Sequence, residues 1–159
     1  MAHTVGMAIS VILHNIRSAH NVGSIFRTAD GAGVSSIYLS GYTPAPLDRF
    51  GRENTEIAKT SLGATHTSRH ESVPDIQVLI QKLKVAGATV VAVEQGKDAV
   101  DYRKYSPDAD TVFIFGNEIT GVEPEVLAGA DACVHIPMSG MKESLNVSVC
   151  AGIILFHYC

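Results

Sequence analysis

The sequence predicts an α/β protein with a mostly parallel sheet and helices on both faces. Short apolar runs rich in β-branched residues alternate with stretches whose apolar residues recur every three or four positions. Strands and helices that alternate in this way build parallel sheets. Residues 88–93 and 111–115 are apolar without interruption, which is typical of strands that helices cover on both faces.

The first part of the chain reads as a strand, a helix and a second strand. Residues 7–13 form an apolar run with β-branched residues, so we expect a strand there. Asn21 is expected to cap the next helix, and Gly33 is expected to end it. Residues 34–40 then alternate as a strand does. The apolar stripe of the helix consists of Val22, Ile25, Phe26, Ala29 and Ala32.

Two further helices and one long loop are expected. Residues 41–54 contain two prolines and two arginines and should form a loop. Residues 73–86 should form a helix, which Gly87 follows. Residues 144–158 are mostly apolar and long enough for a largely buried helix. The apolar face of the middle helix contains Ile76, Leu79, Ile80 and Leu83.

Length and composition fit one domain spanning residues 1–159. The chain is 46% hydrophobic and 18% charged, which is ordinary for a globular protein. No apolar run approaches the ~20 residues that span a bilayer, and residues 1–6 lack the features of a signal peptide. We therefore expect a cytoplasmic protein with no membrane partner. Cys133, Cys150 and Cys159 show no C-x-x-C spacing and are expected to be reduced core thiols.

The formal net charge of −4 argues against a uniformly basic surface. Any contact with a nucleic acid must therefore come from a local basic patch. Other familiar motifs fail. The segment 31–33 lacks the last glycine of a dinucleotide fingerprint, and no P-loop occurs. Ser139 and Lys142 match a hydrolase pattern without its companion motifs. His66 and His70 lack a third ligand, so we expect no metal site.

Polar segments follow the strands, where parallel sheets bind their ligands. These are residues 94–96, 116–118 and 137–146. Glu118 comes directly after a buried strand, so its carboxylate needs a partner, although it could also be an ordinary turn residue. Ser144 precedes the last helix and could cap it, which is compatible with a role in a site.

Arg27 lies on the side of its helix away from the apolar stripe, so it is not a core residue. Taken alone, it reads most simply as a solvated surface arginine. Asn15, Asn21 and Gly23 bring polar groups and a flexible backbone to the start of the same helix. Free N–H groups at a helix start attract anions, which favours a functional interpretation of Arg27.

Three motifs in this order resemble the SpoU/TrmH family of SPOUT methyltransferases. They are N-x-x-x-x-x-N-x-G-x-x-x-R-T-A from Asn15, F-G-N-E-x-x-G from Phe115, and I-P-M…S-L-N-V-S from Ile136. The resemblance covers nearly the whole chain. It implies a trefoil knot near the C-terminus, and a homodimer whose interface includes the last helix and borders the cofactor pocket. It also implies transfer of a methyl group from S-adenosylmethionine to a ribose 2′-hydroxyl of RNA.

The resemblance also implies a set of site residues. The catalytic group would be Asn21, Arg27, Glu118, Ser144 and Asn146. We expect Arg27 to clamp phosphate and stabilise developing alkoxide, since a guanidinium is a poor base. Asn21 would orient Arg27, Glu118 would anchor the polar network, and the other two would place the ribose. The cofactor pocket would comprise Glu94, Gln95, Gly96, Phe115, Gly116, Asn117, Gly121, Ile136, Pro137, Met138, Ser144, Leu145 and Asn146.

The RNA partner is expected to be tRNA rather than rRNA. Its contacts would come from Arg17, His20 and Arg27, and from Arg49 and Arg52 on the long loop, which could equally be solvated. The acidic net charge and the lack of a separate RNA-binding extension depart from some relatives and leave the substrate open. Two alternatives remain: an inactive knotted module that binds the cofactor or RNA, and an α/β enzyme that uses a nicotinamide or nucleotide cofactor.

Overall fold

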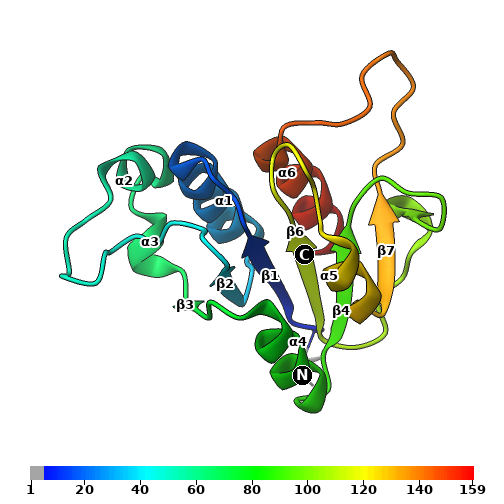
Figure 1. The fold of residues 1–159 in the computed structure, drawn as a ribbon, viewed down its shortest axis with the longest axis horizontal. Helices are drawn as coiled ribbons and strands as arrows, with labels where there is room; N and C mark the ends of the chain where they lie inside the picture. Colours follow the sequence, from blue (N-terminus) through cyan, green and yellow to red (C-terminus); the bar gives the residue numbers. More distant parts are fainter. Residues whose placement is uncertain (1–5) are drawn as a thin grey trace, which may run out of the picture.

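The computed structural model describes residues 6–159, which form a seven-stranded sheet with strand order β3-β2-β1-β6-β4-β7-β5 (Figure 1). Every pairing between these strands is parallel, which confirms the predicted α/β class. The strands are β1 (Ile9–His14), β2 (Ser36–Ser40), β3 (His70–Ser72), β4 (Thr89–Val93), β5 (Val100–Asp101), β6 (Thr111–Phe115) and β7 (Ala132–His135).

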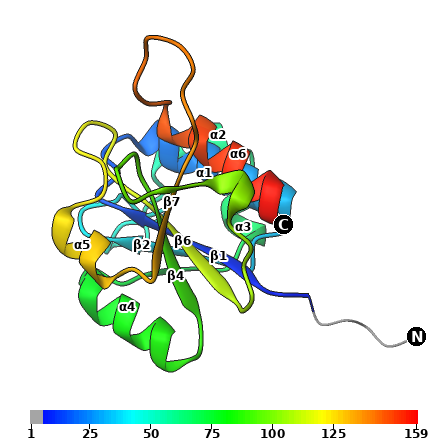
Figure 2. The same ribbon diagram turned by 90° about the vertical axis from the view of Figure 1, so that its right-hand side faces the viewer.

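Helices cover both faces of the sheet. The helices are α1 (Ala19–Ala32), α2 (Thr55–Ser61), α3 (Ala64–Thr67), α4 (Ile76–Val85), α5 (Pro124–Gly129) and α6 (Val147–Tyr158), with a short 3₁₀ turn at Tyr102–Lys104. Figure 2 shows α1 and α6 on one side of the sheet and α4 and α5 on the other. Because strand side chains alternate, Phe113 packs with α1 and α6 while Val112 and Ile114 pack with α4 and α5.

The start of α1 differs from the expectation. The helix begins at Ala19, and Ser18 rather than Asn21 caps it, since the Ser18 hydroxyl accepts the Asn21 N–H at 3.1 Å. Asn21 lies buried in the first turn, so its amide is free to join other groups. The helix ends as predicted, with Gly33 in the left-handed conformation at φ 82°.

The start of α6 is the second correction. Asn146 caps this helix by accepting the Ser148 N–H at 2.9 Å, and α6 begins at Val147. Ser144 is therefore not a cap but part of the loop that precedes the helix. The loop at residues 41–54 is present as predicted, closed by a single bridge between Leu47 and Glu53.

Several short elements have no counterpart among the predicted ones: α2, α3, α5, β3, β5 and β7. Each spans seven residues or fewer, too short for a helical or alternating pattern to stand out. Over residues 6–159, none of the helices has both the length and the apolar character needed to cross a bilayer. The prediction that no signal peptide is present rested on residues 1–6, and residues 1–5 lie outside the described residues. The trefoil knot stays a prediction.

All three cysteines are free thiols, as predicted. Cys133 and Cys150 are partly buried, but Cys159 is exposed at the end of α6, so the expectation of three core thiols is wrong for Cys159. Cys159 follows the last residue of α6, and none of the described elements buries it.

Candidate active site

A pocket lies beyond the carboxyl ends of β4, β6 and β7, where the sequence predicted a ligand site. Three loops form it: the one after β4, the one between β6 and α5, and the long one between β7 and α6, drawn green, yellow and orange in Figure 1. The lining residues are Val93, Glu94, Gln95, Phe115, Gly116, Asn117, Glu118, Ile119, Thr120, Gly121, His135, Ile136, Met138, Ser144, Leu145, Val147 and Cys150.

A tight turn after β6 shapes the floor of this pocket. The backbones of Asn117 and Gly121 pair across the turn, and the Asn117 side chain accepts the N–H groups of Ile119 and Thr120. A Cβ atom on Gly116 would lie 2.5 Å from the backbone of Gly121. Only glycine at position 116 permits this close approach.

The pocket combines an apolar wall with negative charge. Phe115, Ile136 and Leu145 contribute apolar surface, whereas Glu94 and Glu118 contribute carboxylates. Of the described residues that line it, none is lysine or arginine. Such a pocket suits a ligand with apolar parts and a positive charge, and it disfavours the diphosphate of a nicotinamide or nucleotide cofactor.

Glu118 joins the pocket to the start of α1. Its carboxylate accepts the backbone N–H groups of Arg17 and Ser18, both at 3.0 Å, and the Asn21 side-chain amide at 3.3 Å. Although burial raises the pKa of Glu118, these hydrogen bonds outweigh burial and lower it below its usual value. Free N–H groups at a helix start attract anions, and at the start of α1 the carboxylate of Glu118 is that anion.

The same network extends to α6. The Asn146 side-chain amide donates to the Asn21 side-chain oxygen at 3.5 Å. Asn21, Glu118 and Asn146 come from three distant parts of the chain and meet at one place, as the motifs predicted. Ser144 lies in the pocket lining, as Glu118 does. The expected link from Asn21 to Arg27 is not what the structure shows, because the Asn21 amide is engaged with Glu118 and Asn146.

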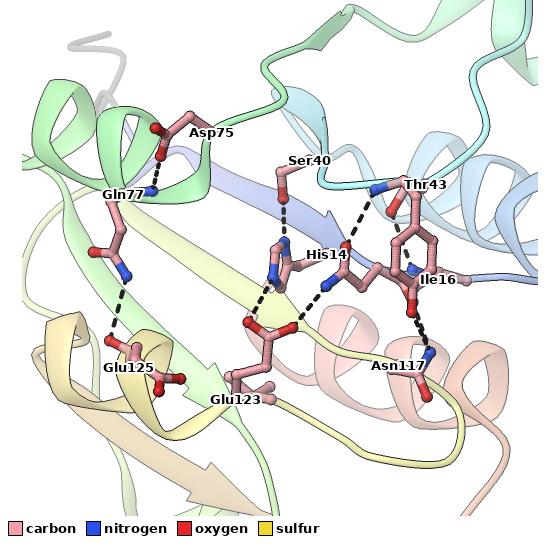
Figure 3. Close-up of polar contacts among 12 residues, drawn as sticks. His14, Ile16, Ser40, Thr43, Asp75, Gln77, Asn117, Glu123 and Glu125 are labelled. Carbon is pink, nitrogen blue, oxygen red and sulfur yellow. Dashed lines mark hydrogen bonds and ion pairs between the residues drawn. The ribbon is translucent and has the colours of Figure 1, made fainter.

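A second polar network holds the neighbouring loops, and Figure 3 shows it. His14 at the end of β1 lies between the Ser40 hydroxyl, at 2.9 Å, and the Glu123 carboxylate, at 3.5 Å. Glu123 also accepts the Asn15 amide at 2.7 Å, and the Asn117 amide donates to the Asn15 carbonyl at 2.9 Å. This network fixes the loop after β1 against the loop after β6, the two segments that carry Ser18 and Glu118.

Arg27 lies outside the pocket of its own chain. Its side chain is exposed on α1, roughly 9 Å further along the helix axis than Asn21. Gly31 is one turn after Arg27 on the same side of α1, and a Cβ atom there would lie 3.6 Å from the Phe156 ring of α6, so Arg27 lies on the side of α1 that borders Phe156. The structure thus joins three of the five predicted catalytic residues in one network, places Ser144 in the pocket lining and leaves Arg27 apart.

Comparison with known proteins agrees with this arrangement. Residues 8–156 match the model of the SpoU rRNA Methylase family. A tRNA (guanosine(18)-2′-O)-methyltransferase from Thermus thermophilus is 38% identical over 149 residues, which cover 93% of this chain and 72% of that protein.

The chain belongs to this family.

Two solved structures are also similar. The A. aeolicus TrmH/SpoU tRNA modifying enzyme has a TM-score of 0.82 at 32% identity, covering 94% of this chain and 73% of that one. The AdoMet-bound rRNA methyltransferase from Sinorhizobium meliloti has a TM-score of 0.87 at 31% identity. The match covers 99% of this chain but only 57% of the Sinorhizobium chain, so that relative has a large part with no counterpart here.

Membership of the SpoU family makes the chain an RNA 2′-O-methyltransferase that uses S-adenosylmethionine. The residues present fit this cofactor. The cofactor carries an adenine ring with apolar faces and a positive sulfonium, which match the apolar wall and the two carboxylates of the pocket. Ten predicted cofactor residues line the pocket: Glu94, Gln95, Phe115, Gly116, Asn117, Gly121, Ile136, Met138, Ser144 and Leu145.

Some lining residues were missed and some predicted ones lie outside the lining. Gly96, Pro137 and Asn146 are not among the residues that line the pocket. The lining residues that the sequence did not suggest are Val93, Ile119, Thr120, His135, Val147 and Cys150. Each of these is next or close to a predicted residue in the sequence, so wider segments would have included them. Nothing in the sequence signalled the network around His14 and Glu123, because its members are far apart along the chain.

The predicted RNA-binding residues fall into two groups. Arg17 and His20 are exposed at the start of α1, beside the pocket. The loop of residues 41–54, which contains Arg49 and Arg52, lies at the far left of Figure 1, at the opposite edge of the molecule from β7. There the Arg52 guanidinium pairs with Asp48 at 2.7 Å, and both arginines lie over the ring of Phe50. The pairing with Asp48 reduces the positive charge that this loop offers.

Proposed function

We propose that this chain transfers the methyl group of S-adenosylmethionine to a ribose 2′-hydroxyl of tRNA, acting as a homodimer. The observation that carries the proposal is the network of Asn21, Glu118 and Asn146 at the rim of the pocket. These side chains converge from the three motif segments, and they join the pocket to the helix that carries Arg27.

The residues of the pocket have distinct roles in this proposal. Phe115, Ile136 and Leu145 hold the apolar part of the cofactor, and Gly116 lets the backbone approach it closely. When bound, S-adenosylmethionine supplies an electrophilic methyl group. Ser144 and Asn146 place the ribose hydroxyl, and Glu118 keeps the start of α1 in position. Alignment of two bound reactants contributes up to about 7–11 kcal/mol to such a reaction.

Arg27 serves the pocket of a second copy of the chain. It is exposed and lies outside the lining of its own pocket, but it lies on the side of α1 that borders Phe156 of α6. From a neighbouring subunit, its guanidinium clamps an RNA phosphate and stabilises the developing alkoxide. The hydroxyl proton goes to a neighbouring group or to water, since a guanidinium holds its own protons too tightly.

The surface of α6 supports the homodimer. Helix α6 is apolar around most of its circumference, whereas a helix that borders water is normally polar on its outer face. Val149 and Phe156 are 51% and 63% exposed in the single chain. A second copy that covers this face buries both side chains and brings its own α1 near the pocket.

RNA contact in this proposal comes mainly from residues near the pocket. Arg17 and His20 stand beside Glu118, and Arg27 of the second copy adds a further cation. Arg49 and Arg52 contribute from the long loop. We place the reaction in the cytoplasm, where thiols such as those of Cys133 and Cys150 stay reduced. Residues 1–159 act as one catalytic domain.

The choice of tRNA rests on the tRNA methyltransferases from Thermus thermophilus and A. aeolicus, while the Sinorhizobium relative is named for rRNA. The test supplies S-adenosylmethionine with a trideuterated methyl group to the purified protein and to RNA from a strain that lacks its gene. Mass spectrometry of digested tRNA and rRNA should show a deuterated 2′-O-methyl nucleoside in the tRNA. Label only in rRNA would contradict tRNA as the substrate. Label in neither RNA would indicate an inactive binding module.

A further inference from the structure

A carboxylate without an ion-pair partner among the described residues lies in the wall of the pocket. Glu94 follows β4 and is half-buried. One of its oxygens accepts the Gln95 N–H and the other accepts the Val122 N–H, each at 2.8 Å. These bonds orient the carboxylate, but both donors are neutral backbone amides. Over residues 6–159, no lysine, arginine or histidine side chain forms an ion pair with Glu94.

The charge of Glu94 acts on other groups of the pocket wall. Burial raises the pKa of the Cys150 thiol to about 12, and the negative charge of Glu94 adds to this rise. Burial and then Glu94 also raise the pKa of the Cys133 thiol. Cys150 lines the pocket, so the field of Glu94 extends to groups that a bound ligand would face.

The second carboxylate of the pocket is differently placed. Glu118 accepts hydrogen bonds from Arg17, Ser18 and Asn21 at the start of α1, where the helix dipole is positive. That positive end offsets much of the Glu118 charge. Glu94 has only two isolated N–H groups, and it is therefore the main source of negative potential in the pocket.

Methyl transfer changes the charge of the ligand in this pocket. S-Adenosylmethionine carries a sulfonium, whereas its product S-adenosylhomocysteine is a neutral thioether with otherwise the same groups. A fixed negative charge favours the sulfonium over the thioether. We propose that Glu94 makes the pocket select the charged methyl donor over the neutral product. This inference rests on the proposed function, because it concerns the ligand of that same site.

The consequence concerns product release. The donor binds with the help of Glu94, and that help disappears once the methyl group has left, so the product leaves more readily. Because the sulfonium loses its charge along the reaction, the same carboxylate stabilises the reactant more than the transition state. Glu94 therefore strengthens binding of the donor relative to the product and favours product release. It does not act as a catalytic residue.

The test compares the wild-type protein with Glu94→Gln, which removes the charge and keeps one oxygen acceptor. Titration calorimetry gives Kd for S-adenosylmethionine, S-adenosylhomocysteine and sinefungin, which carries an ammonium in place of the methylsulfonium. We expect the ratio of the product Kd to the donor Kd to fall by about three- to tenfold in Glu94→Gln. Sinefungin should lose affinity as the donor does.

Two further variants make the result specific. Glu94→Asp keeps the charge and should keep the ratio within about twofold of wild type, even if both ligands bind more weakly. Glu125→Gln removes an exposed carboxylate of α5 outside the pocket and should change nothing. A parallel loss of donor and product affinity in Glu94→Gln, or a fallen ratio in Glu94→Asp, would overturn the inference. Failure of the wild-type protein to bind either ligand would instead overturn the proposed function.

Discussion

Glu118 is the side chain on which the polar rim of the pocket depends. It belongs to the loop after β6, yet all of its side-chain hydrogen-bond donors from elsewhere in the chain belong to the start of α1. A single carboxylate thus fixes a loop of the cofactor pocket to the helix that carries Asn21 and Arg27. This position explains why a glutamate is needed there: neutral glutamine has only one acceptor oxygen for three donors.

The ionisation of Glu118 makes this link dependent on pH. Its pKa is lower in the folded protein than its ordinary value, so its contribution to stability is complete above that ordinary value, at about pH 4.5. The contribution is lost as the pH falls through the folded pKa. Since Glu118 is partly exposed, we expect it to amount to only about 0.5–1 kcal/mol.

Urea unfolding of the wild-type protein and of Glu118→Gln measures this contribution. The difference in unfolding free energy between the two proteins should be largest near pH 7 and should shrink as the pH approaches 3. Glu125→Gln, which alters an exposed carboxylate, serves as the control. A difference that stays constant with pH would show that the charge of Glu118 has no part in the link.

Substitution of Arg27 should separate binding from chemistry. Because Arg27 lies outside the pocket lining, Arg27→Ala should bind S-adenosylmethionine within about twofold of wild type. Loss of its positive charge near the developing alkoxide should lower kcat by about 10²–10³-fold. Calorimetry and single-turnover methyl transfer to tRNA measure the two effects, with Arg69→Ala as an exposed arginine control. Normal turnover in Arg27→Ala would remove this residue from the mechanism.

The sequence predicted which residues belong to the site better than it predicted which of them contact one another. Asn21, Glu118 and Asn146 do come together and Ser144 lines the same pocket as Glu118, because each lies in a motif segment that follows a strand or begins a helix. Asn21 does not contact Arg27 as predicted, and it does not cap α1 either. Ser18 and Asn21 are both good capping residues three positions apart, and the sequence does not show which of them the helix uses.

Among the elements, the turn after β6 is the most constrained part of the pocket. Gly116→Ala should place a Cβ atom 2.5 Å from the backbone of Gly121, so the turn must open. We expect at least about a tenfold loss of S-adenosylmethionine affinity and a loss of about 1–3 kcal/mol in unfolding free energy. Calorimetry and urea unfolding measure both quantities.

Gly140→Ala is the matched control for Gly116→Ala. Gly140 lies on the loop between β7 and α6, and a Cβ atom there would meet nothing within 4 Å. It should therefore leave affinity and stability nearly unchanged. Equal effects of the two substitutions would show that the close approach at Gly116 does not shape the pocket.

The longer elements were predictable, and the short ones were not. Helix α4 and strands β4 and β6 contain enough apolar residues for their periodicity to show. Strand β5 has two residues and strand β3 has three exposed ones, so pairing with a neighbour rather than local pattern forms them. The caps of α1 and α6 were each misplaced by two or three residues for a related reason, since several polar residues precede both helices.

At the scale of the whole molecule, the outer face of α6 and the position of Arg27 point to the same second copy. Phe156→Glu should place a charge in that interface and dissociate the dimer. Since the active site then lacks the second Arg27, methyl transfer should fall together with dimer content, whereas S-adenosylmethionine should still bind. Analytical ultracentrifugation and transfer assays measure these effects. An active monomer would contradict the dimeric site.

Two properties of the whole molecule could not be read from residue patterns alone. The isolation of Arg27 from its own pocket depends on how α1 lies across the sheet, which no local periodicity reveals. The pairing of Arg52 with Asp48 also depends on the folded loop, and it weakens an RNA contact that the sequence suggested. Such features follow from tertiary packing rather than from sequence spacing.

Mixed dimers test most directly whether the pocket of one chain and Arg27 of another form one site. Arg27→Ala homodimers keep their pockets and lack the guanidinium, while Gly116→Ala homodimers lack an intact pocket. If Arg27 acts across the interface, co-refolding equal amounts should restore about a quarter of wild-type methyl transfer, because half the dimers are mixed and each has one complete site. No activity above that of the two separate variants would contradict a site shared between subunits.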